Sequence, residues 1–294
     1  MAAHYSAGET KVRPGIYFRE TNGSGTELIS ARNGVAAAAF KANWGPLGEV
    51  ITISSPSEIE EYYGDDSAEG SNVSILEKIF LGGASQIKAV RVGSGGTKAT
   101  ITLKDTAESA ASVVTLTAKY AGTRPLSVTI KDSLSVETQR ECIVLSGTKE
   151  LMKVSFAKGS GEVDALVSAI NGNETAVVIA QKVSAGNGTL AAITQTAFTT
   201  AGVSPAVTNT DYSDAFALLE ATQFNTICVD SDDSAVHALL HAFIVRAHDS
   251  GIMAMAVTGD PVSENYSDRK ENAAAFNSML HIHCVNGFEA DGEV

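Results

Sequence analysis

Two different patterns of apolar residues occupy different parts of this chain, and they restrict the folds that it can adopt. After about residue 205, nearly continuous apolar runs such as "NTICVD", "IMAMAVTGD" and "HIHCVNG" alternate with helical segments. Strand and helix signals also follow one another from Val35 to about residue 93. Strands that are apolar throughout are buried on both faces, which is typical of a parallel sheet covered by helices. The sequence therefore predicts an α/β core with a mainly parallel sheet.

The region between these two segments has a different pattern. From about residue 97 to 205, short runs such as "KATITLKD" and "ECIVLSG" alternate apolar with polar residues, and turn residues separate them. This pattern predicts antiparallel β structure, with one helix at "EVDALVSAING" and a linker at "TTAGVSPAVTNT". We therefore expect a multidomain α/β protein (α+β overall), in which residues 22–93 and 206–294 form a discontinuous core and residues 94–205 an inserted β-rich domain.

Residues 1–21 are expected to form an extended N-terminal arm. In "VRPGIYFRE", Pro14 and Gly15 argue against a helix, while Ile16, Tyr17 and Phe18 favour a strand. The glycines of "TNGSGTELISARNG" leave this strand loosely connected to the core. A β-prone segment on a flexible connection is either a disordered tail or an arm that adds a strand to a neighbouring sheet.

Two helices of the first core segment have recognisable ends. Ser55-Pro56-Ser57-Glu58 has the sequence of a capping box with proline at the first helical position, and Gly64 is expected to end that helix. The next helix, in "SNVSILEKIFLGGAS", carries its apolar residues on one face and is expected to end at Gly82-Gly83.

The composition argues against several classes of function. A formal net charge of −13 without a Lys/Arg cluster disfavours nucleic-acid binding, which needs a basic face. No apolar run approaches the roughly 20 residues of a membrane span, and "MAAHYSAGETKVRPG" lacks the apolar core of a signal peptide. We therefore expect a protein made and folded in the cytosol. Cys142, Cys228 and Cys284 are predicted to be buried free thiols, and no CxxC pair suggests zinc.

The segment 225–248 contains three histidines at helical spacing. His237 and His241 lie one turn apart and could share an ion, whereas His248 lies about 10 Å further along the helix. Metal ligands must each lie within roughly 2 Å of a zinc ion, and "HALLH" lacks the glutamate of HExxH. The sequence favours histidines at the edge of a buried helix face over a metal site, and the same holds for His281 and His283 on one strand face.

Aspartates in the same segment allow two interpretations. Asp230 and Asp232 follow an apolar strand, as do the nucleophile and acid/base pair of haloacid-dehalogenase-like phosphohydrolases, with Thr258 and Lys270 as the corresponding hydroxyl and lysine. Alternatively, Asp232, Asp233 or Ser234 caps the helix that follows. No later strand ends in the acidic pair that would hold magnesium. We therefore interpret the segment as a capped turn and keep the phosphohydrolase as the alternative function.

Several motifs occur in an order that resembles one protein family. "PGIYFRE", "FKANWGPLGEVITISSPSEIEEYYG", "LEKIFLGGASQIKAVRVG" and "LTAKYAGTRPLSVTI" are similar to successive segments of contractile tail sheath proteins from phages and R-type bacteriocins, of the Gram-positive type. The residues that carry the motif are Trp44, Gly45, Pro46, Gly48, Gly64, Phe80, Gly82, Gly83 and Arg91. In that family a strand like "HIHCVNGFE" leads into a further C-terminal segment, so we expect this chain, which ends at "ADGEV", to lack it.

The resemblance implies a structural subunit of a contractile injection system, with no catalytic residue, metal or cofactor. Such subunits would polymerise around a tail tube by β-strand augmentation, with Ile16, Tyr17 and Phe18 as the donated strand and residues 19–34 as a hinge. The implied partners are other sheath subunits, the tail tube protein, the baseplate and the tail terminator, with no nucleic acid and no membrane insertion. Assembly would take place in the bacterial cytoplasm. A β-rich surface adhesin would need an export signal, which the sequence lacks.

Overall fold

The computed structural model describes residues 3–4, 17–18, 34–65, 70–261 and 263–285, and the chain divides into two units, 1–33 and 34–294. In the first unit, β1 (Ala3–His4) and β2 (Tyr17–Phe18) pair in parallel. Two of the three residues expected to form a strand are therefore extended. The third, Ile16, and most of the expected arm and hinge lie outside the described residues.

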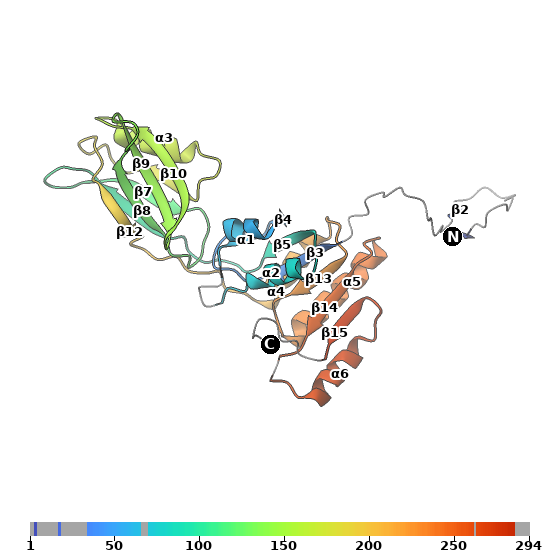
Figure 1. Cartoon of the computed structure of the whole chain (residues 1–294). Coiled ribbons are helices and arrows are strands. Elements are labelled where there is room, and N and C mark those ends of the chain that lie inside the picture. The colour runs from blue at the N-terminus through green and yellow to red at the C-terminus, as the bar shows by residue number, and fades with distance from the viewer. Residues whose placement is uncertain (1–2, 5–16, 19–33, 66–69, 262, 286–294) are drawn as a thin grey trace. The chain divides into compact units, whose positions relative to one another are not determined.

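A six-stranded sheet organises the core of the second unit (Figure 1). Its order is β15-β14-β13-β3-β5-β4, and every neighbouring pair is parallel except β4 with β5. The prediction of a mainly parallel sheet is confirmed. The strands are β3 (Val35–Phe40), β4 (Val50–Ile53), β5 (Gln86–Arg91), β13 (Thr226–Val229), β14 (Met255–Gly259) and β15 (His281–Cys284).

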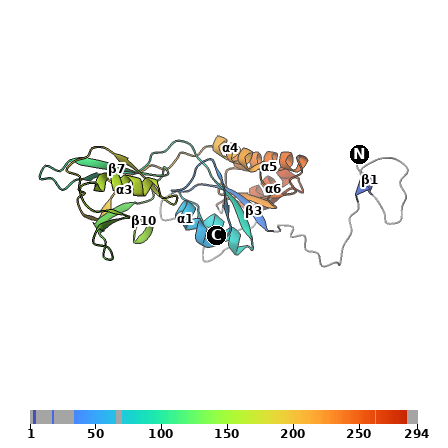
Figure 2. The same cartoon turned by 90° about the horizontal axis from the view of Figure 1, so that it is seen from above.

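Helices cover both faces of the middle of this sheet (Figure 2). One apolar core joins it to α1 (Pro56–Tyr63) and α2 (Ser74–Leu81), and a second joins the opposite face to α4 (Asn209–Leu219) and α5 (Ser234–Asp249). The last helix, α6 (Tyr266–Phe276), packs beside β15. Strand β3 contributes alternate residues to the two cores and is buried throughout, which explains its run of alanines.

The expected ends of α1 are only partly confirmed. Helix α1 begins with Pro56 and ends at Gly64, whose φ of +77° is accessible to glycine. The predicted capping box is wrong, because the Ser55 side chain makes no capping hydrogen bond. Glu58 instead accepts a hydrogen bond from the backbone N–H of Ser54, at 3.0 Å, one residue before the N-cap.

Two antiparallel sheets and one helix form the region between residues 94 and 205, and they share one apolar core. The first sheet has the order β10-β9-β8-β12 and the second β11-β7-β6. The elements are β6 (Thr100–Lys104), β7 (Ser112–Ala118), β8 (Ser127–Asp132), β9 (Gln139–Ser146), β10 (Lys149–Ala157), α3 (Glu162–Asn171), β11 (Val178–Lys182) and β12 (Ile193–Ala197).

The two connections to this β-rich region pair with each other. Isolated antiparallel bridges join Ser94 with Ala206, Thr97 with Val203 and Thr100 with Thr200. The segment expected to be a linker is therefore hydrogen-bonded to the entering strand. This pairing supports the predicted boundaries near residues 94 and 205, which remain a prediction.

The packing of α5 yields a prediction about stability. Leu240 is fully buried between helix and sheet, whereas Val245 on the same helix is 38% exposed. We expect Leu240→Ala to lower the free energy of unfolding by about 2–5 kcal/mol, because it leaves a cavity in the core. Val245→Ala should change it by less than about 0.5 kcal/mol. Urea unfolding followed by circular dichroism measures both, and equal effects would contradict the described packing.

Candidate functional site

A buried arginine joins the parallel sheet to the β-rich region. Arg91, at the end of β5, is only 1% exposed. Its guanidinium group donates hydrogen bonds to the carbonyl oxygens of Ala42 (Nε, 3.0 Å), Gly45 (Nη1, 2.8 Å) and Ala121 (Nη1, 2.9 Å). Burial lowers the pKa of Arg91 to about 10, so the group stays charged at neutral pH. One side chain thus holds the β3–β4 loop and the loop after β7 together.

Glycines allow the backbones to approach closely around this arginine. A Cβ atom at Gly122 would lie 1.8 Å from the carbonyl oxygen of Asn43, and one at Gly45 would lie 2.4 Å from that of Tyr62. Gly45 also has a φ of +106°, which side-chain-bearing residues rarely adopt. Any larger residue at these two positions would push the loops away from Arg91.

The single tryptophan packs across the same junction. Trp44 lies in the β3–β4 loop but belongs to the apolar core of the β-rich region, and it is 1% exposed. Its ring meets that of Tyr120 edge-on, with centroids 5.3 Å apart, and the Arg124 guanidinium lies 5.7 Å from its centroid. Such aromatic and cation–π contacts stabilise a packed ring beyond its burial alone. Burial lowers the pKa of Arg124.

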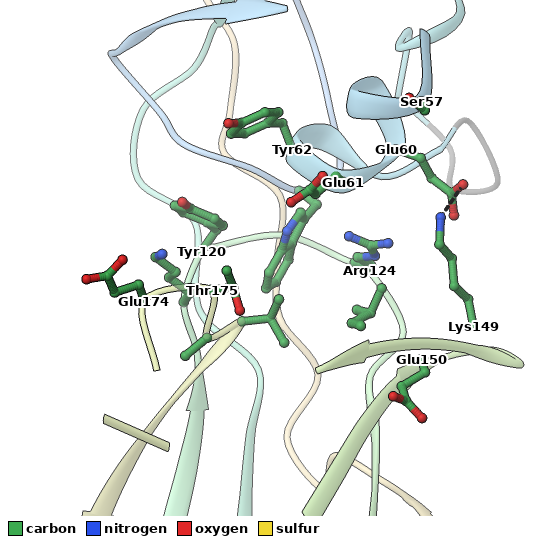
Figure 3. Close-up of a pocket in the computed structure, with 15 residues that line it drawn as sticks. Ser57, Glu60, Glu61, Tyr62, Tyr120, Arg124, Lys149, Glu150, Glu174 and Thr175 are labelled. Carbon is green, nitrogen blue, oxygen red and sulfur yellow. Dashed lines mark ion pairs between the residues drawn. The ribbon is translucent and has the colours of Figure 1, made fainter. Parts of the chain in front are cut away.

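A hollow of about 440 Å³ opens beside Trp44 (Figure 3). Side chains from α1 line one wall, and side chains from the β-rich region line the other. The Lys149 ammonium group pairs with the Glu60 carboxylate across it. Both side chains are about half exposed, so this ion pair contributes little to stability. The hollow therefore lies between α1 and the β-rich region, whose arrangement is held by the buried contacts of Arg91 and Trp44.

The structure brings together some of the residues expected from the tail sheath motif. Trp44, Gly45, Gly64 and Arg91 meet at the junction. Pro46 is buried and Gly48 exposed in the same loop, whereas Phe80, Gly82 and Gly83 lie at the end of α2, where the chain turns towards the start of β5. Their roles remain a prediction. Sequence reasoning missed Asn43, Tyr120, Gly122 and Arg124, although the last three lie in the quoted segment "LTAKYAGTRPLSVTI".

Asp230, considered above as a nucleophile, is a structural acceptor. Its Oδ2 atom accepts from the Lys41 N–H at 2.8 Å and from the Asn72 amide at 2.7 Å, and its Oδ1 atom accepts from the Tyr212 hydroxyl group. Burial and the nearby Asp230 carboxylate raise the pKa of Tyr212. Both oxygens of Asp230 therefore have partners from three separate segments, which leaves it poorly suited to attack a substrate.

The rest of the segment forms the expected capped turn. Asp233 is the N-cap of α5 and accepts from the Ala235 N–H at 2.8 Å, while Asp232 is exposed. The Thr258 hydroxyl group contacts two histidines, and Lys270 is exposed on α6. The interpretation of Asp233 as a helix cap is confirmed.

The positions of the histidines differ from the prediction that they lie at the edge of a buried helix face. His237 is 1% exposed, and its Nε2 atom lies 2.8 Å from the Ser231 carbonyl oxygen, so the prediction of an edge position is wrong there. The cause is that α6 and β15 pack over this side of α5, which brings His237 and His241 beside His281 and His283. Among the described residues, no three His, Cys, Asp or Glu side chains are arranged to hold a metal ion. Within that same part of the chain, no helix has the length and apolar character of a membrane span.

Two glycines of one loop test the junction. Gly45 and Gly48 both have positive φ, but a Cβ atom would clash only at Gly45. We expect Gly45→Ala to destabilise the chain by about 3 kcal/mol or more, since it adds overpacking to backbone strain. Gly48→Ala should cost only about 1 kcal/mol. Urea unfolding followed by Trp44 fluorescence compares them, and equal losses would contradict the close approach at Gly45.

A second prediction separates structure from catalysis at Asp230. We expect Asp230→Asn to lower the free energy of unfolding by roughly 1–3 kcal/mol, because the amide faces three donors with a single acceptor oxygen. The exposed Asp232→Asn should be neutral within about 0.5 kcal/mol. Magnesium-dependent hydrolysis of p-nitrophenyl phosphate should be absent from all three proteins. If the unsubstituted chain hydrolyses the phosphate ester and Asp232→Asn abolishes this activity, the purely structural role of Asp230 is overturned.

Comparisons with known proteins agree on one family. Residues 205–290 match the family model of the phage tail sheath protein central domain. A sheath tail protein from Listeria innocua has 22% sequence identity and a TM-score of 0.56, over 79% of this chain and 49% of that one. A sheath tail protein from Desulfitobacterium hafniense has 23% identity and a TM-score of 0.59, over 95% of this chain and 58% of that one. No curated protein matches.

This chain thus spans about half the length of the solved structures that it resembles. The likeness to them shows the fold, with a mixed sheet and separate antiparallel sheets. Together, the family match and the shared fold support a phage tail sheath protein.

Proposed function

We propose that this chain is a subunit of a contractile tail sheath that polymerises around a tail tube and drives it through a cell envelope. The observation that carries the proposal is the match of residues 205–290 to the central domain of phage tail sheath proteins. The Asp230 geometry supports it further, since the one carboxylate that resembled a nucleophile is bound within the fold. The particle would be a phage tail or a related bacteriocin, assembled in the bacterial cytoplasm.

Strand exchange is the proposed mode of assembly. In the described part of the chain, β4 and β15 each have a neighbour on one side only. A free sheet edge offers backbone N–H and C=O groups to an incoming strand. The donor would be the arm residues Ile16, Tyr17 and Phe18 of a neighbouring subunit, with residues 19–34 as the hinge. The extended conformation of Tyr17–Phe18 is compatible with that role.

Contraction would require a subunit that moves without deforming. The junction around Arg91 supports this property, because buried hydrogen bonds and Trp44 fix the β-rich region to the sheet. We propose residues 22–93 with 206–294 as the part that builds the lattice and residues 94–205 as an outward-facing insertion. The work would come from subunit interfaces that are better satisfied after contraction, on a trigger from the baseplate, without nucleotide hydrolysis.

Electron microscopy tests the assembly. The chain is expressed as given and also continued through any residues encoded after Val294, and both are compared with Tyr17→Pro and Leu134→Ser. We expect tubes from the continued chain and none from its Tyr17→Pro variant, because proline removes a donor from the strand ladder. Leu134, 95% exposed between β8 and β9, serves as the control and should leave assembly unchanged.

Circular dichroism must show that Tyr17→Pro subunits are folded. Tubes formed equally well by that variant would contradict strand donation, but not the sheath assignment. Discrete particles from every form, including the continued chain, would contradict the polymer itself.

A further inference from the structure

Four histidines gather where α5, β14, β15 and α6 meet, and the sheath function does not account for them. His237 and His241 come from α5, and His281 and His283 come from β15. The ring centroids of His241 and His281 are 5.4 Å apart, and those of His237 and His283 are 5.8 Å apart. Strand β15, which carries two of them, is the outermost strand at one end of the sheet (Figure 1).

A continuous chain of hydrogen bonds runs through three of these rings. His241 Nδ1 lies 3.3 Å from His281 Nδ1, and His281 Nε2 lies 2.7 Å from the Thr258 hydroxyl oxygen. That oxygen is also 2.8 Å from His283 Nδ1, and His283 Nε2 is 2.9 Å from Asp260 Oδ2. A neutral imidazole has one donor and one acceptor, and a hydroxyl group has one proton to donate. With all rings neutral, each group donates to the next one towards Asp260.

The same chain has room for one extra proton but not for two. Protonated His283 pairs with Asp260, and the donations then reverse, from His283 through Thr258 and His281 to His241. A second proton on His241 then places two Nδ1–H donors, those of His241 and His281, against each other. A second proton on His281 instead leaves the Thr258 hydroxyl proton without an acceptor. Either proton also adds a second cation to the cluster, where like charges repel.

The carboxylates of Asp260 and Asp232 only partly offset additional charge, because burial and the neighbouring His283 still lower the pKa of His237. From the end of β14, Asp260 binds His283 and also accepts from the Asn272 amide of α6 at 3.1 Å. Phe276 of α6 stacks on His281 with centroids 4.0 Å apart. Asp232 acts on His237 from a distance, and Arg269 donates to the carbonyl oxygens at the ends of the two strands.

Both strongly buried rings favour the neutral form. Burial, followed by the neighbouring histidines, lowers the pKa of His281 to about 4. Burial also lowers the pKa of His237. His237 and His281 thus resist protonation at neutral pH in the folded chain.

Apolar packing contributes little to this end of the sheet. Helix α6 has no buried residue. Ile282 of β15 is 45% exposed, and Met279, just before β15, is 91% exposed. In contrast, His281 is 93% buried, with 7% of its surface exposed. The histidine contacts therefore add to the backbone pairing of β15 with β14 and to the hydrogen bonds of Arg269 and Asn272 in attaching α6 and β15 to the rest of the fold.

We propose that these histidines form an acid-sensitive latch, which holds α6 and β15 on the sheet at neutral pH and releases them when the cluster takes up two or more protons. Release would uncover β14 as a new sheet edge. This inference concerns the fold of the chain itself and does not depend on the proposed function.

The direction of the pH dependence follows from proton counts. In the released form a histidine titrates near its ordinary value of 6.5, whereas His281 in the closed form titrates near 4. Between these values the released form binds more protons, so release becomes more favourable as the pH falls. Its equilibrium constant rises by up to about tenfold per pH unit for each proton taken up, and it is constant above pH 6.5.

Hydrogen exchange measured by mass spectrometry tests the latch. Rates at pH 7.5 and 5.0 are corrected for the intrinsic effect of pH on exchange and compared between residues 266–285 and the central strand, Val35–Phe40. We expect the opening constant of residues 266–285 to rise by about 30-fold or more at pH 5.0. This pH lies about 1.5 units below the ordinary histidine pKa of 6.5, and each proton taken up contributes about tenfold per unit. The central strand should not change. An opening constant that is independent of pH would overturn the proposal.

Matched variants locate the effect. His281→Gln removes the buried titrating ring and should abolish most of the pH dependence, whereas His248→Gln, on α5 but outside the cluster, should retain it. If His281→Gln leaves the segment open at pH 7.5, the half-buried His241→Gln replaces it. Full pH dependence in both cluster variants, or its loss in His248→Gln, would contradict the latch.

The tautomers provide a separate measurement. Nitrogen NMR of the histidine-labelled protein at pH 7.5 should show His281 protonated on Nε2 and bare on Nδ1, as the chain towards Asp260 requires. The opposite tautomer, with His283 neutral, would contradict the described hydrogen-bond chain.

Discussion

The rest of this structure depends on the buried charge of Arg91. Removing a guanidinium group from water is costly unless its N–H groups find partners, and here three carbonyl oxygens from two regions of the chain accept from Nε and Nη1, while the buried Nη2 atom has no partner among the described residues. Those carbonyls in turn have to come within 3 Å of one side chain. Glycine at positions 45 and 122 makes this approach possible, and Trp44 fills the adjacent space. The hydrogen bonds of Arg91 and the packing of Trp44 thus together fix the β-rich region on the sheet.

Much of the fold could be predicted from local patterns. Strands buried on both faces consist of apolar runs, whereas strands with one exposed face alternate apolar and polar residues. This difference distinguishes the parallel sheet from the antiparallel sheets. Strand β12 escaped prediction because most of it is exposed and Gln195 has a φ of +41°, which interrupts the alternation. The capping box failed for a different reason. A sequence motif specifies which groups are able to bond, while the backbone decides whether Glu58 reaches residue 54 or 55.

The candidate site was less accessible to sequence reasoning because its contacts are distant along the chain. Arg91 lies 49 residues from Ala42 and 30 from Ala121, and Asp230 lies 189 residues from Lys41. The resemblance to tail sheath proteins selected Trp44, Gly45, Gly64 and Arg91, but only the structure shows the close packing that requires them. For Asp230 the sequence offered a nucleophile or a cap. The structure shows a carboxylate that joins three segments, which no local pattern could indicate.

The two ends of the parallel sheet are held by different kinds of interaction. At the β5 end, Arg91 bonds to the backbone and Trp44 is packed in an apolar core, and neither changes between pH 5 and 8. At the β15 end, apolar burial is slight and hydrogen-bonded histidines connect strand and helix. Stability in a protein is local, so weakly packed elements open before the core does. Because the weakly packed element is also the outermost strand, a change at the histidines would alter an edge available for strand addition while the rigid junction stays intact.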